Sequence, residues 1–331
     1  MKRRAYITGP LLPAGLSLLQ GKAELVVEPG PAPPTRERLL EQVAAADGLL
    51  ALVTSRIDAE VIAAAGRLRV ISNFAVGYDN IDVQAATRAG ILVTNTPDVL
   101  TETTADLAFA LMLAAARRLG EAERFVRSGQ WNLWQPDLLL GRDVWGATLG
   151  IVGLGRIGRA VARRARGFGM HILYADERPD PRAEAELECS FRSLEDLLRE
   201  SDFVTIHLPL NDRTRGLFGA GRFALMKPTA ILINTARGPI VDQRALYEAL
   251  RAKRLAAAGL DVTDPEPIRP DDPLLTLDNC VILPHIGSAS VRTRDRMAEL
   301  AARNLLDALE GRRPAHCVNP EVIDQGRWRK A

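Results

Sequence analysis

The sequence feature that most constrains the fold is a glycine-rich turn near the middle of the chain. A short apolar run, residues 149–152, leads directly into the pattern Gly153-x-Gly155-x-x-Gly158 and then into a segment of helical character. A strand, a tight glycine turn and a helix in this order are typical of a dinucleotide-binding unit. In such a unit the three glycines permit the turn, let the backbone approach a pyrophosphate and let helix and strand pack closely.

The residues around this turn indicate which dinucleotide is bound. The first N–H groups of the helix, at Arg156, Ile157 and Gly158, can bind phosphates. The next apolar run ends at Asp176, at about the 20-residue spacing expected for a carboxylate that binds the adenosine ribose. An acidic residue there repels a 2′-phosphate, so the sequence favours NAD. Arg178 leaves NADP as the less favoured alternative.

Bulk composition excludes several other classes of protein. The length of 331 residues predicts about two domains, and the hydrophobic content of 47% is ordinary for a globular protein. A net charge of +2 gives no strong electrostatic attraction to nucleic acid or to an anionic membrane surface. No apolar run reaches the length of a membrane span. Three widely spaced cysteines and the lack of a signal-peptide pattern predict a cytoplasmic protein with no metal site.

Short apolar strands alternate with helical segments on both sides of the glycine turn. Before the turn we predict strands at 5–8, 24–28, 48–53, 70–74 and 91–95, with helices at 36–46, 83–89 and 101–119, the last capped by Thr101. After it we predict strands at 203–208, 230–234, 256–262 and 281–283, with helices at 194–200, 243–252 and 290–309. Such alternation indicates parallel sheets covered by helices on both faces.

Residues 120–146 interrupt this alternation. They contain Trp131, Trp134 and Trp145, three of the four tryptophans of the chain. The segment is either a packed loop or an apolar arm that embraces a second subunit. We favour the arm, because an apolar stretch of this kind left exposed would be poorly soluble.

Three residues that could carry out chemistry follow predicted strands, at the edge of the sheet where α/β proteins bind ligands. Arg237 can hold a carboxylate with paired hydrogen bonds and polarise a carbonyl. His285 can give and take a proton near neutral pH, and Glu266 can orient its imidazole and favour the protonated form. The three together suit hydride chemistry at a 2-keto or 2-hydroxy acid.

Six segments of the chain carry a resemblance to a known family. They are residues 76–82, 103–108, 150–158, 234–238, 261–267 and 284–287. Together they resemble the D-isomer-specific 2-hydroxyacid dehydrogenases, close to the glyoxylate/hydroxypyruvate reductase branch. The resemblance implies catalytic roles for Arg237, Glu266 and His285, and a homodimer. It also implies NAD(H)-dependent reduction of small 2-keto acids to D-2-hydroxy acids.

The resemblance further implies a fold and additional site residues. A Rossmann NAD-binding domain, residues 100–288 with a dimerisation arm at about 120–146, would be inserted into a flavodoxin-like substrate domain made of residues 1–99 and 289–331. The substrate carboxylate would be held by backbone N–H groups of Val76 and Gly77, and Trp134 would reach the neighbouring subunit's site. The family pattern places these residues along the cofactor: Thr104, Leu208, Pro209, Thr235, Ala236 and Asp261, the last near the carboxamide.

Two differences from related sequences restrict the expected substrate and cofactor. Phosphite dehydrogenases of similar sequence carry a lysine where this chain has Val76, which argues against phosphite. NADP-preferring reductases usually have a small residue and an arginine where this chain has Asp176 and Glu177. The alternatives that stay open are another 2-keto acid, such as a keto-sugar acid, and an NADH-sensing binding protein similar to the family's corepressors.

Overall fold

The computed structural model describes residues 2–30, 32–324 and 328. The chain divides into two compact units, Met1–Leu100 with Ala289–Ala331 and Thr101–Ser288, called unit 1 and unit 2 below. The predicted substrate domain also includes residues 1, 31, 325–327 and 329–331, which lie outside the described residues.

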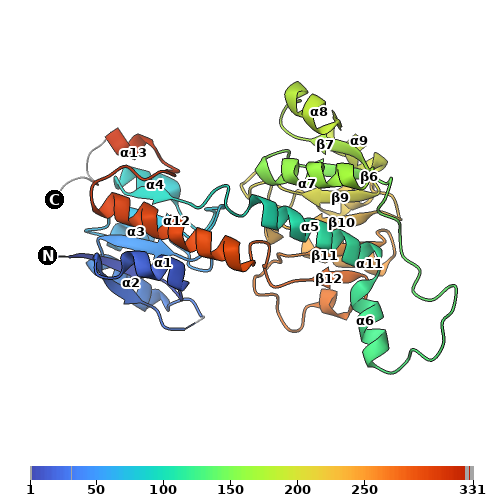
Figure 1. Cartoon of the computed structure of the whole chain (residues 1–331), viewed down its shortest axis with the longest axis horizontal. Coiled ribbons are helices and arrows are strands. Elements are labelled where there is room, and N and C mark those ends of the chain that lie inside the picture. Colours follow the sequence, from blue (N-terminus) through green and yellow to red (C-terminus); the bar gives the residue numbers. More distant parts are fainter. Residues whose placement is uncertain (1, 31, 325–327, 329–331) are drawn as a thin grey trace. The chain divides into compact units, whose positions relative to one another are not determined.

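Unit 1 is built on a parallel sheet with strand order β2-β1-β3-β4-β5, the flavodoxin-like order (Figure 1). Its strands are β1 Arg3–Ile7, β2 Ala23–Val27, β3 Gly48–Ala51, β4 Val70–Asn73 and β5 Leu92–Thr94. Its helices are α1 Pro13–Leu19, α2 Arg36–Ala45, α3 Ala59–Ala64, α4 Val83–Arg88, α12 Val291–Leu309 and α13 Glu321–Asp324. Helices α1 and α12 cover one face of the sheet, and α2, α3 and α4 cover the other.

The return of the chain to unit 1 depends on close packing between α1 and α12. A Cβ added to Gly15 in α1 would lie 2.5 Å from the backbone oxygen of Ala298 in α12. Because backbone atoms cannot yield easily, only glycine permits this approach. The last helix thus fills a place in the core of the first unit, against β3 and β4.

Unit 2 is built on a larger parallel sheet with strand order β12-β11-β10-β9-β6-β7-β8, the order of a Rossmann fold extended by one strand. Its strands are β6 Thr148–Val152, β7 His171–Ala175, β8 Cys189–Phe191, β9 Phe203–Ile206, β10 Ile231–Asn234, β11 Ala257–Leu260 and β12 Cys280–Ile282. Its helical elements are α5 Thr101–Ala116, α6 Leu119–Arg127, α7 Arg156–Gly167, α8 Pro181–Leu187, α9 Leu194–Glu200, α10 Ala220–Phe223, η1 Gly238–Ile240, α11 Gln243–Arg251 and η2 Pro273–Thr276.

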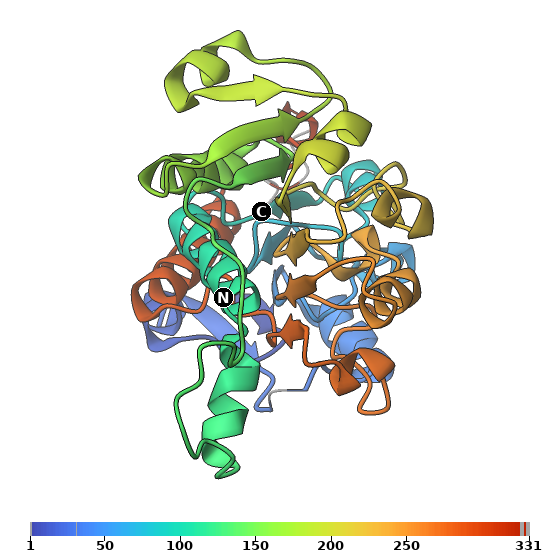
Figure 2. The same cartoon turned by 90° about the vertical axis from the view of Figure 1, so that its right-hand side faces the viewer.

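Helices cover both faces of this second sheet, as Figure 2 shows. Side chains of α5, α7 and α8 pack on one face, and those of α9, α10 and α11 pack on the other. Buried on both faces, the strands are nearly continuous runs of apolar residues, as parallel strands require. The predicted fold class, two parallel-sheet α/β domains, is confirmed.

The segment between α5 and β6 differs from its sequence-based description. The predicted helix over 101–119 ends at Ala116, because Arg118 adopts a left-handed conformation with φ 53°, and Leu119 begins α6. The prediction of Thr101 as the N-cap was also wrong, since Thr101 is already the first residue of α5.

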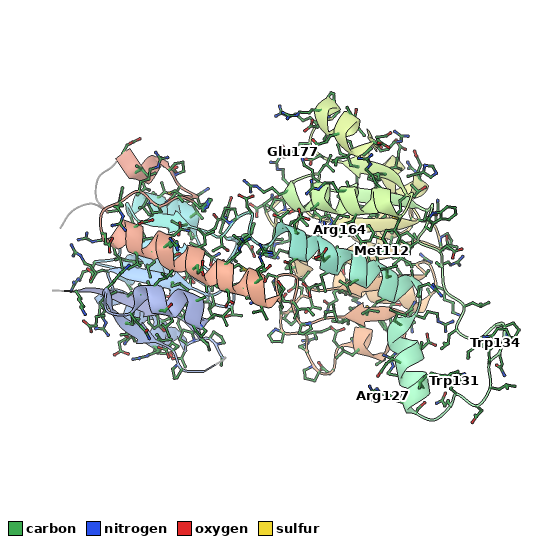
Figure 3. The ribbon with its side chains drawn as sticks, viewed as in Figure 1. Met112, Arg127, Trp131, Trp134, Arg164 and Glu177 are labelled. Carbon is green, nitrogen blue, oxygen red and sulfur yellow. The ribbon has the colours of Figure 1, made fainter. Side chains whose placement is uncertain are left out.

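Most large apolar side chains of this segment are exposed rather than packed, although Val144 is buried in the core of unit 2. Helix α6 buries none of its residues, and Trp131 and Trp134 are 57% and 73% exposed. Figure 3 shows both tryptophans on the stretch that follows α6, away from the sheet of unit 2. The alternative of a packed loop is therefore wrong for this chain taken alone.

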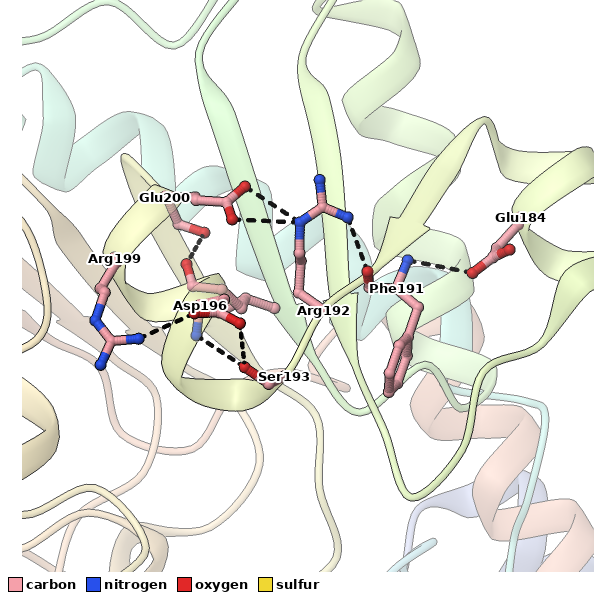
Figure 4. A network of polar contacts seen from close by, with 9 residues as sticks. Glu184, Phe191, Arg192, Ser193, Asp196, Arg199 and Glu200 are labelled. Carbon is pink, nitrogen blue, oxygen red and sulfur yellow. Dashed lines mark hydrogen bonds and ion pairs between the residues drawn. The ribbon is translucent and has the colours of Figure 1, made fainter.

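The outer edge of the unit 2 sheet, beside β7, is held by polar contacts (Figure 4). The N–H of Phe191 in β8 donates to Glu184 in α8 at 3.2 Å. Ser193 caps α9 by accepting from the N–H of Asp196 at 3.1 Å. Among the described residues, no helix combines the length and apolar character that a membrane crossing requires.

Candidate active site

The glycine turn predicted from the sequence joins β6 to α7, and two of its glycines are required by contacts. Gly153 has φ +96°, and a Cβ there would lie 2.9 Å from the backbone oxygen of His207. A Cβ on Gly158 would lie 2.2 Å from the backbone oxygen of Gly153. Neither position can accept a side chain without moving the backbone. The turn is therefore held tightly between β6 and β9.

Gly155 has the opposite surroundings. A Cβ on Gly155 would meet nothing within 4 Å, so open space lies beside its backbone. Gly155 is the N-cap of α7 and supplies no side-chain acceptor for the first N–H groups of that helix. An uncapped helix N-terminus beside open space suits a phosphate group, because its N–H groups and positive dipole end both favour an anion.

Leu154 in the middle of the turn is fixed from two sides. Its N–H donates to Oδ2 of Asp176 at 2.8 Å, and its backbone oxygen accepts from Nε of Arg159 at 3.1 Å. The second guanidinium contact of Arg159 is to Asp180 at 2.6 Å. Helix α7 is in turn tied to α5 by ion pairs of Arg164, labelled in Figure 3, with Glu102 and Asp106.

Asp176 thus contacts the glycine turn in addition to its predicted contact with a ribose. Its Oδ1 accepts from the N–H of Glu177 at 2.8 Å, so each carboxylate oxygen has one backbone donor. A carboxylate oxygen can accept two hydrogen bonds, so each keeps capacity for a ligand hydroxyl. Because Asp176 is exposed, that capacity is open to solvent. The ribose contact stays a prediction.

Three further predicted cofactor residues line the same edge of the sheet. Leu208 follows β9, and one of its methyl carbons lies 3.0 Å from where a Cβ on Gly153 would stand. Pro209 comes next, exposed, with its backbone oxygen accepting from Thr214. Thr235 follows β10, and its hydroxyl is buried without a hydrogen-bond partner among the described residues. A buried hydroxyl of this kind is available to a polar ligand.

The turn after β12 is organised by Asp261, which directly follows β11. Its two carboxylate oxygens accept from the N–H groups of Ile286 at 2.7 Å and Gly287 at 2.8 Å. Its backbone oxygen accepts from the N–H of His285 at 2.9 Å. Burial raises the pKa of Asp261, and the two backbone donors oppose this by stabilising the charged form.

This turn holds His285 in an unusual backbone conformation. His285 has φ 54°, in the left-handed region that few non-glycine residues adopt. Three hydrogen bonds that Asp261 accepts from the N–H groups of consecutive residues stabilise it. Thr104 at the start of α5 packs behind the turn, 3.4 Å from the Cβ position of Gly287. The sequence pattern placed Asp261 near the cofactor carboxamide and did not predict this structural role.

The structure brings His285 together with Glu266. Nδ1 of His285 forms a hydrogen bond with Oε1 of Glu266, and both side chains are partly exposed, by 30% and 38%. A carboxylate on Nδ1 fixes the ring orientation and leaves Nε2 for another partner. This is the arrangement of a general acid or base with its orienting group.

Arg237 comes from the neighbouring loop. The backbone after it is pressed against the loop that leads to Glu266, since a Cβ on Gly238 would lie 1.9 Å from the oxygen of Thr263. Asn234 stabilises the Arg237 loop by donating to the Arg237 oxygen at 2.9 Å and accepting from the N–H of Ala236 at 3.0 Å. Arg237, Glu266 and His285 therefore stand on adjoining loops at the carboxyl ends of β10, β11 and β12 in unit 2.

The remaining predicted residues lie elsewhere in the chain. Val76 and Gly77 are half-buried on the loop that follows β4 in unit 1. Trp134 lies on the exposed stretch after α6. Their roles at a substrate stay predictions.

The fold and the glycine turn together define a dinucleotide-binding protein, and comparison with known proteins gives the family. The family described as D-isomer specific 2-hydroxyacid dehydrogenase, NAD binding domain, matches residues 109–287. A glyoxylate reductase from Korarchaeum cryptofilum is 53% identical over 98% of both chains. The chain belongs to the D-isomer specific 2-hydroxyacid dehydrogenases and is an oxidoreductase, as the resemblance implied.

Solved structures agree with this assignment. A crystal structure of a protein from Thermus thermophilus has a TM-score of 0.90 and 50% identity, covering 95% of this chain and 99% of its own. An NADPH-dependent glyoxylate/hydroxypyruvate reductase from Sinorhizobium meliloti, in complex with NADP and malonate, has a TM-score of 0.84. It is 33% identical, with 96% of this chain and 97% of its own covered.

The residues of unit 2 fit the cofactor that the family implies. The N-terminus of α7 beside Gly155, which has no side-chain cap, suits the pyrophosphate. The buried hydroxyl of Thr235, which has no hydrogen-bond partner in the described part of the chain, suits a polar group of the ligand. Asp176 and Glu177 place acidic side chains where a 2′-phosphate would need cations. NAD is thus the favoured cofactor, and NADP is possible.

We predict that Gly158→Ala weakens NADH binding at least about tenfold, because the added methyl would displace the turn by its contact with Gly153. The matched control is Gly167→Ala at the other end of α7, where a Cβ meets nothing within 4 Å. Titration of NADH fluorescence measures both affinities. Equal NADH affinity for wild type and Gly158→Ala would contradict the assignment of this turn.

Proposed function

We propose that the protein reduces small 2-keto acids to D-2-hydroxy acids with NADH, and that glyoxylate and hydroxypyruvate are its substrates. The observation that carries the proposal is the Glu266–His285 pair on the turn held by Asp261, beside the Arg237 loop. The relative from Korarchaeum cryptofilum, a glyoxylate reductase that is 53% identical, supports the choice of substrate.

The proposed reaction requires a hydride donor, a group that binds and polarises the substrate, and a proton donor. The bound dinucleotide supplies the hydride for the carbonyl carbon. Arg237 pairs with the substrate carboxylate and polarises the carbonyl through its guanidinium. His285 donates a proton from Nε2 to the carbonyl oxygen, while Glu266 accepts from Nδ1–H and stabilises the protonated ring. In the reverse direction the same imidazole takes the hydroxyl proton.

Two features refine the proposed substrate and cofactor. The N–H groups of Val76 and Gly77 hold the substrate carboxylate in this proposal, and Val76 at this position argues against phosphite. Asp176 and Glu177 favour NAD over NADP, although the Sinorhizobium meliloti neighbour is NADPH-dependent. A larger 2-keto acid, such as a keto-sugar acid, is the alternative substrate.

A panel of substrates tests the proposal directly. We expect NADH-dependent turnover with glyoxylate and hydroxypyruvate, lower kcat/KM with a keto-sugar acid, and lower kcat/KM with NADPH than with NADH. An NADH-sensing binding protein, the alternative function, would bind NADH but turn over none of the panel at a useful rate. That outcome would refute the enzymatic proposal, and a clear preference for NADPH would refute the role given to Asp176.

We also propose that the protein is a homodimer joined through the predicted arm, about residues 120–146. Six of its apolar side chains are exposed by half or more, which a protein surface in water disfavours: Val126, Trp131, Leu133, Trp134, Leu140 and Trp145. In this proposal Trp134 reaches the site of the partner subunit.

We further propose a cytoplasmic location. The free thiols of Cys189, Cys280 and Cys317 support it, because thiols persist in reducing compartments.

Sedimentation of a double variant tests the dimer. We expect wild type to sediment as a dimer and Trp131→Ser/Trp134→Ser to shift toward monomer, because the variant loses two exposed apolar anchors. Leu275→Ser, at a residue 48% exposed on η2 outside the segment, is the matched control and should stay dimeric. A monomeric wild type would contradict the proposal.

A further inference from the structure

Three consecutive peptide groups on the loop after β4 have their carbonyl sides held by the rest of unit 1. The oxygens and their donors are Ala75 with the N–H of Thr96 at 2.9 Å, Val76 with Nδ2 of Asn95 at 2.8 Å, and Gly77 with Nδ2 of Asn73 at 2.8 Å. Two of these donors are side-chain amides placed at the ends of β4 and β5.

Holding a carbonyl fixes the N–H of the same peptide group. In a trans peptide the C=O and the following N–H point in opposite directions, within one plane. The contact of Asn95 with the Val76 oxygen therefore orients the N–H of Gly77, and the contact of Thr96 with Ala75 orients the N–H of Val76. Within the described part of the chain, neither N–H donates to an acceptor of the protein. A donor on the carbonyl also polarises the peptide and strengthens its N–H as a donor.

The two asparagines are themselves fixed. The backbone oxygen of Asn95 accepts from Nδ2 of Asn304 in α12 at 3.1 Å. The side chain of Asn73 is fully buried and exchanges hydrogen bonds with the amide of Asn80, at 3.3 and 3.2 Å. Asn80 in turn donates to the oxygen of Ser55 at 3.1 Å. The amide of Asn73 cannot turn without breaking its contacts with Asn80, and the contact of Asn304 fixes the backbone that carries the side chain of Asn95.

We propose that Asn95 is a positioning residue for the substrate carboxylate, acting through the peptide group that joins Val76 to Gly77. The assignment rests on the proposed function, in which these N–H groups bind that carboxylate. Asn73 supports this stretch indirectly, because the Gly77 oxygen that it holds belongs to the next peptide group, whose N–H is that of Tyr78. The asparagines hold an anion-binding stretch of backbone in shape rather than contact the substrate themselves.

The assignment predicts a specific kinetic signature. The substrate carboxylate carries the same charge before and during hydride transfer, so contacts to it stabilise the ground state and the transition state alike. Loss of such contacts raises KM and leaves kcat nearly unchanged. A general loss of stability would instead lower the amount of active enzyme without changing KM.

Steady-state kinetics of Asn95→Ala with glyoxylate and NADH test the assignment. We expect KM for glyoxylate to rise about tenfold, with kcat and the KM for NADH within about twofold of wild type. Asn279→Ala is the matched control, since Nδ2 of Asn279 also donates to a backbone oxygen, that of Ala256 at 3.0 Å, in unit 2. The control should keep the wild-type KM for glyoxylate.

Aspartate has nearly the same size as asparagine, so Asn95→Asp is the variant to test if Asn95→Ala does not fold. Its carboxylate oxygen would face the Val76 oxygen, and two hydrogen-bond acceptors repel each other. KM for glyoxylate should therefore rise above that of Asn95→Ala. Relative to wild type at each pH, that excess should shrink as the pH falls, because a protonated carboxyl can donate again. A pH-independent excess would overturn the assignment.

The outcomes separate this assignment from the proposed function. A wild-type KM in the Asn95 variants, with wild-type turnover of glyoxylate, would overturn the assignment alone. A wild-type enzyme that does not turn over glyoxylate or hydroxypyruvate would remove the proposed function and the assignment with it. An equal rise of KM in the Asn279 control would also overturn the assignment.

Discussion

The hydrogen bonds of Asp261 are the interaction on which the candidate active site depends. One residue, at the carboxyl end of β11, accepts from the N–H groups of His285, Ile286 and Gly287. These bonds help to offset the cost of a histidine at φ 54°, a conformation that costs of order 1–3 kcal/mol. The buried carboxylate has a raised pKa, and its two backbone donors supply the compensation that a buried charge needs.

The parallel sheet of unit 2 gathers the other groups around this turn. Strands that run in the same direction end at the same edge, so β6 delivers the glycine turn, β7 Asp176, β10 Arg237 and β12 His285. The order of the strands follows from the crossover connections, which place β6 and β9 side by side at the centre. Residues that are far apart in the sequence are thus brought to the same edge of the sheet.

The sequence was most informative where a single residue type is obligatory. The glycine turn could be predicted because Gly153 and Gly158 face backbone oxygens that exclude any Cβ. The placement of Arg237, Glu266 and His285 at one edge of the sheet could be predicted because each follows a strand, and the hydrogen bond of Glu266 with His285 agrees with the pairing expected from the sequence. Their catalytic roles stay predictions. The fold class followed from the alternation of strands and helices.

Other features depend on contacts that no local pattern reveals. Helix α6 was not predicted, because the break before it is a left-handed Arg118, a residue type with no special tendency to end helices. The roles of Asn95 and Asp261 lie in backbone groups that they hold, which are far away in the sequence. The place of α12 in unit 1 followed only from the family resemblance, since its apolar face gives no sign of which sheet it covers.

The central claim is that Asp261 acts on the reaction through His285, and a double-mutant cycle tests it most directly. The measured quantity is kcat for glyoxylate reduction in wild type, Asp261→Asn, His285→Ala and the double variant, with NADH affinity measured alongside. The account predicts that Asp261→Asn lowers kcat about a hundredfold or more and costs nothing further in the His285→Ala background. Additive losses in the double variant, or a wild-type kcat in Asp261→Asn, would contradict it.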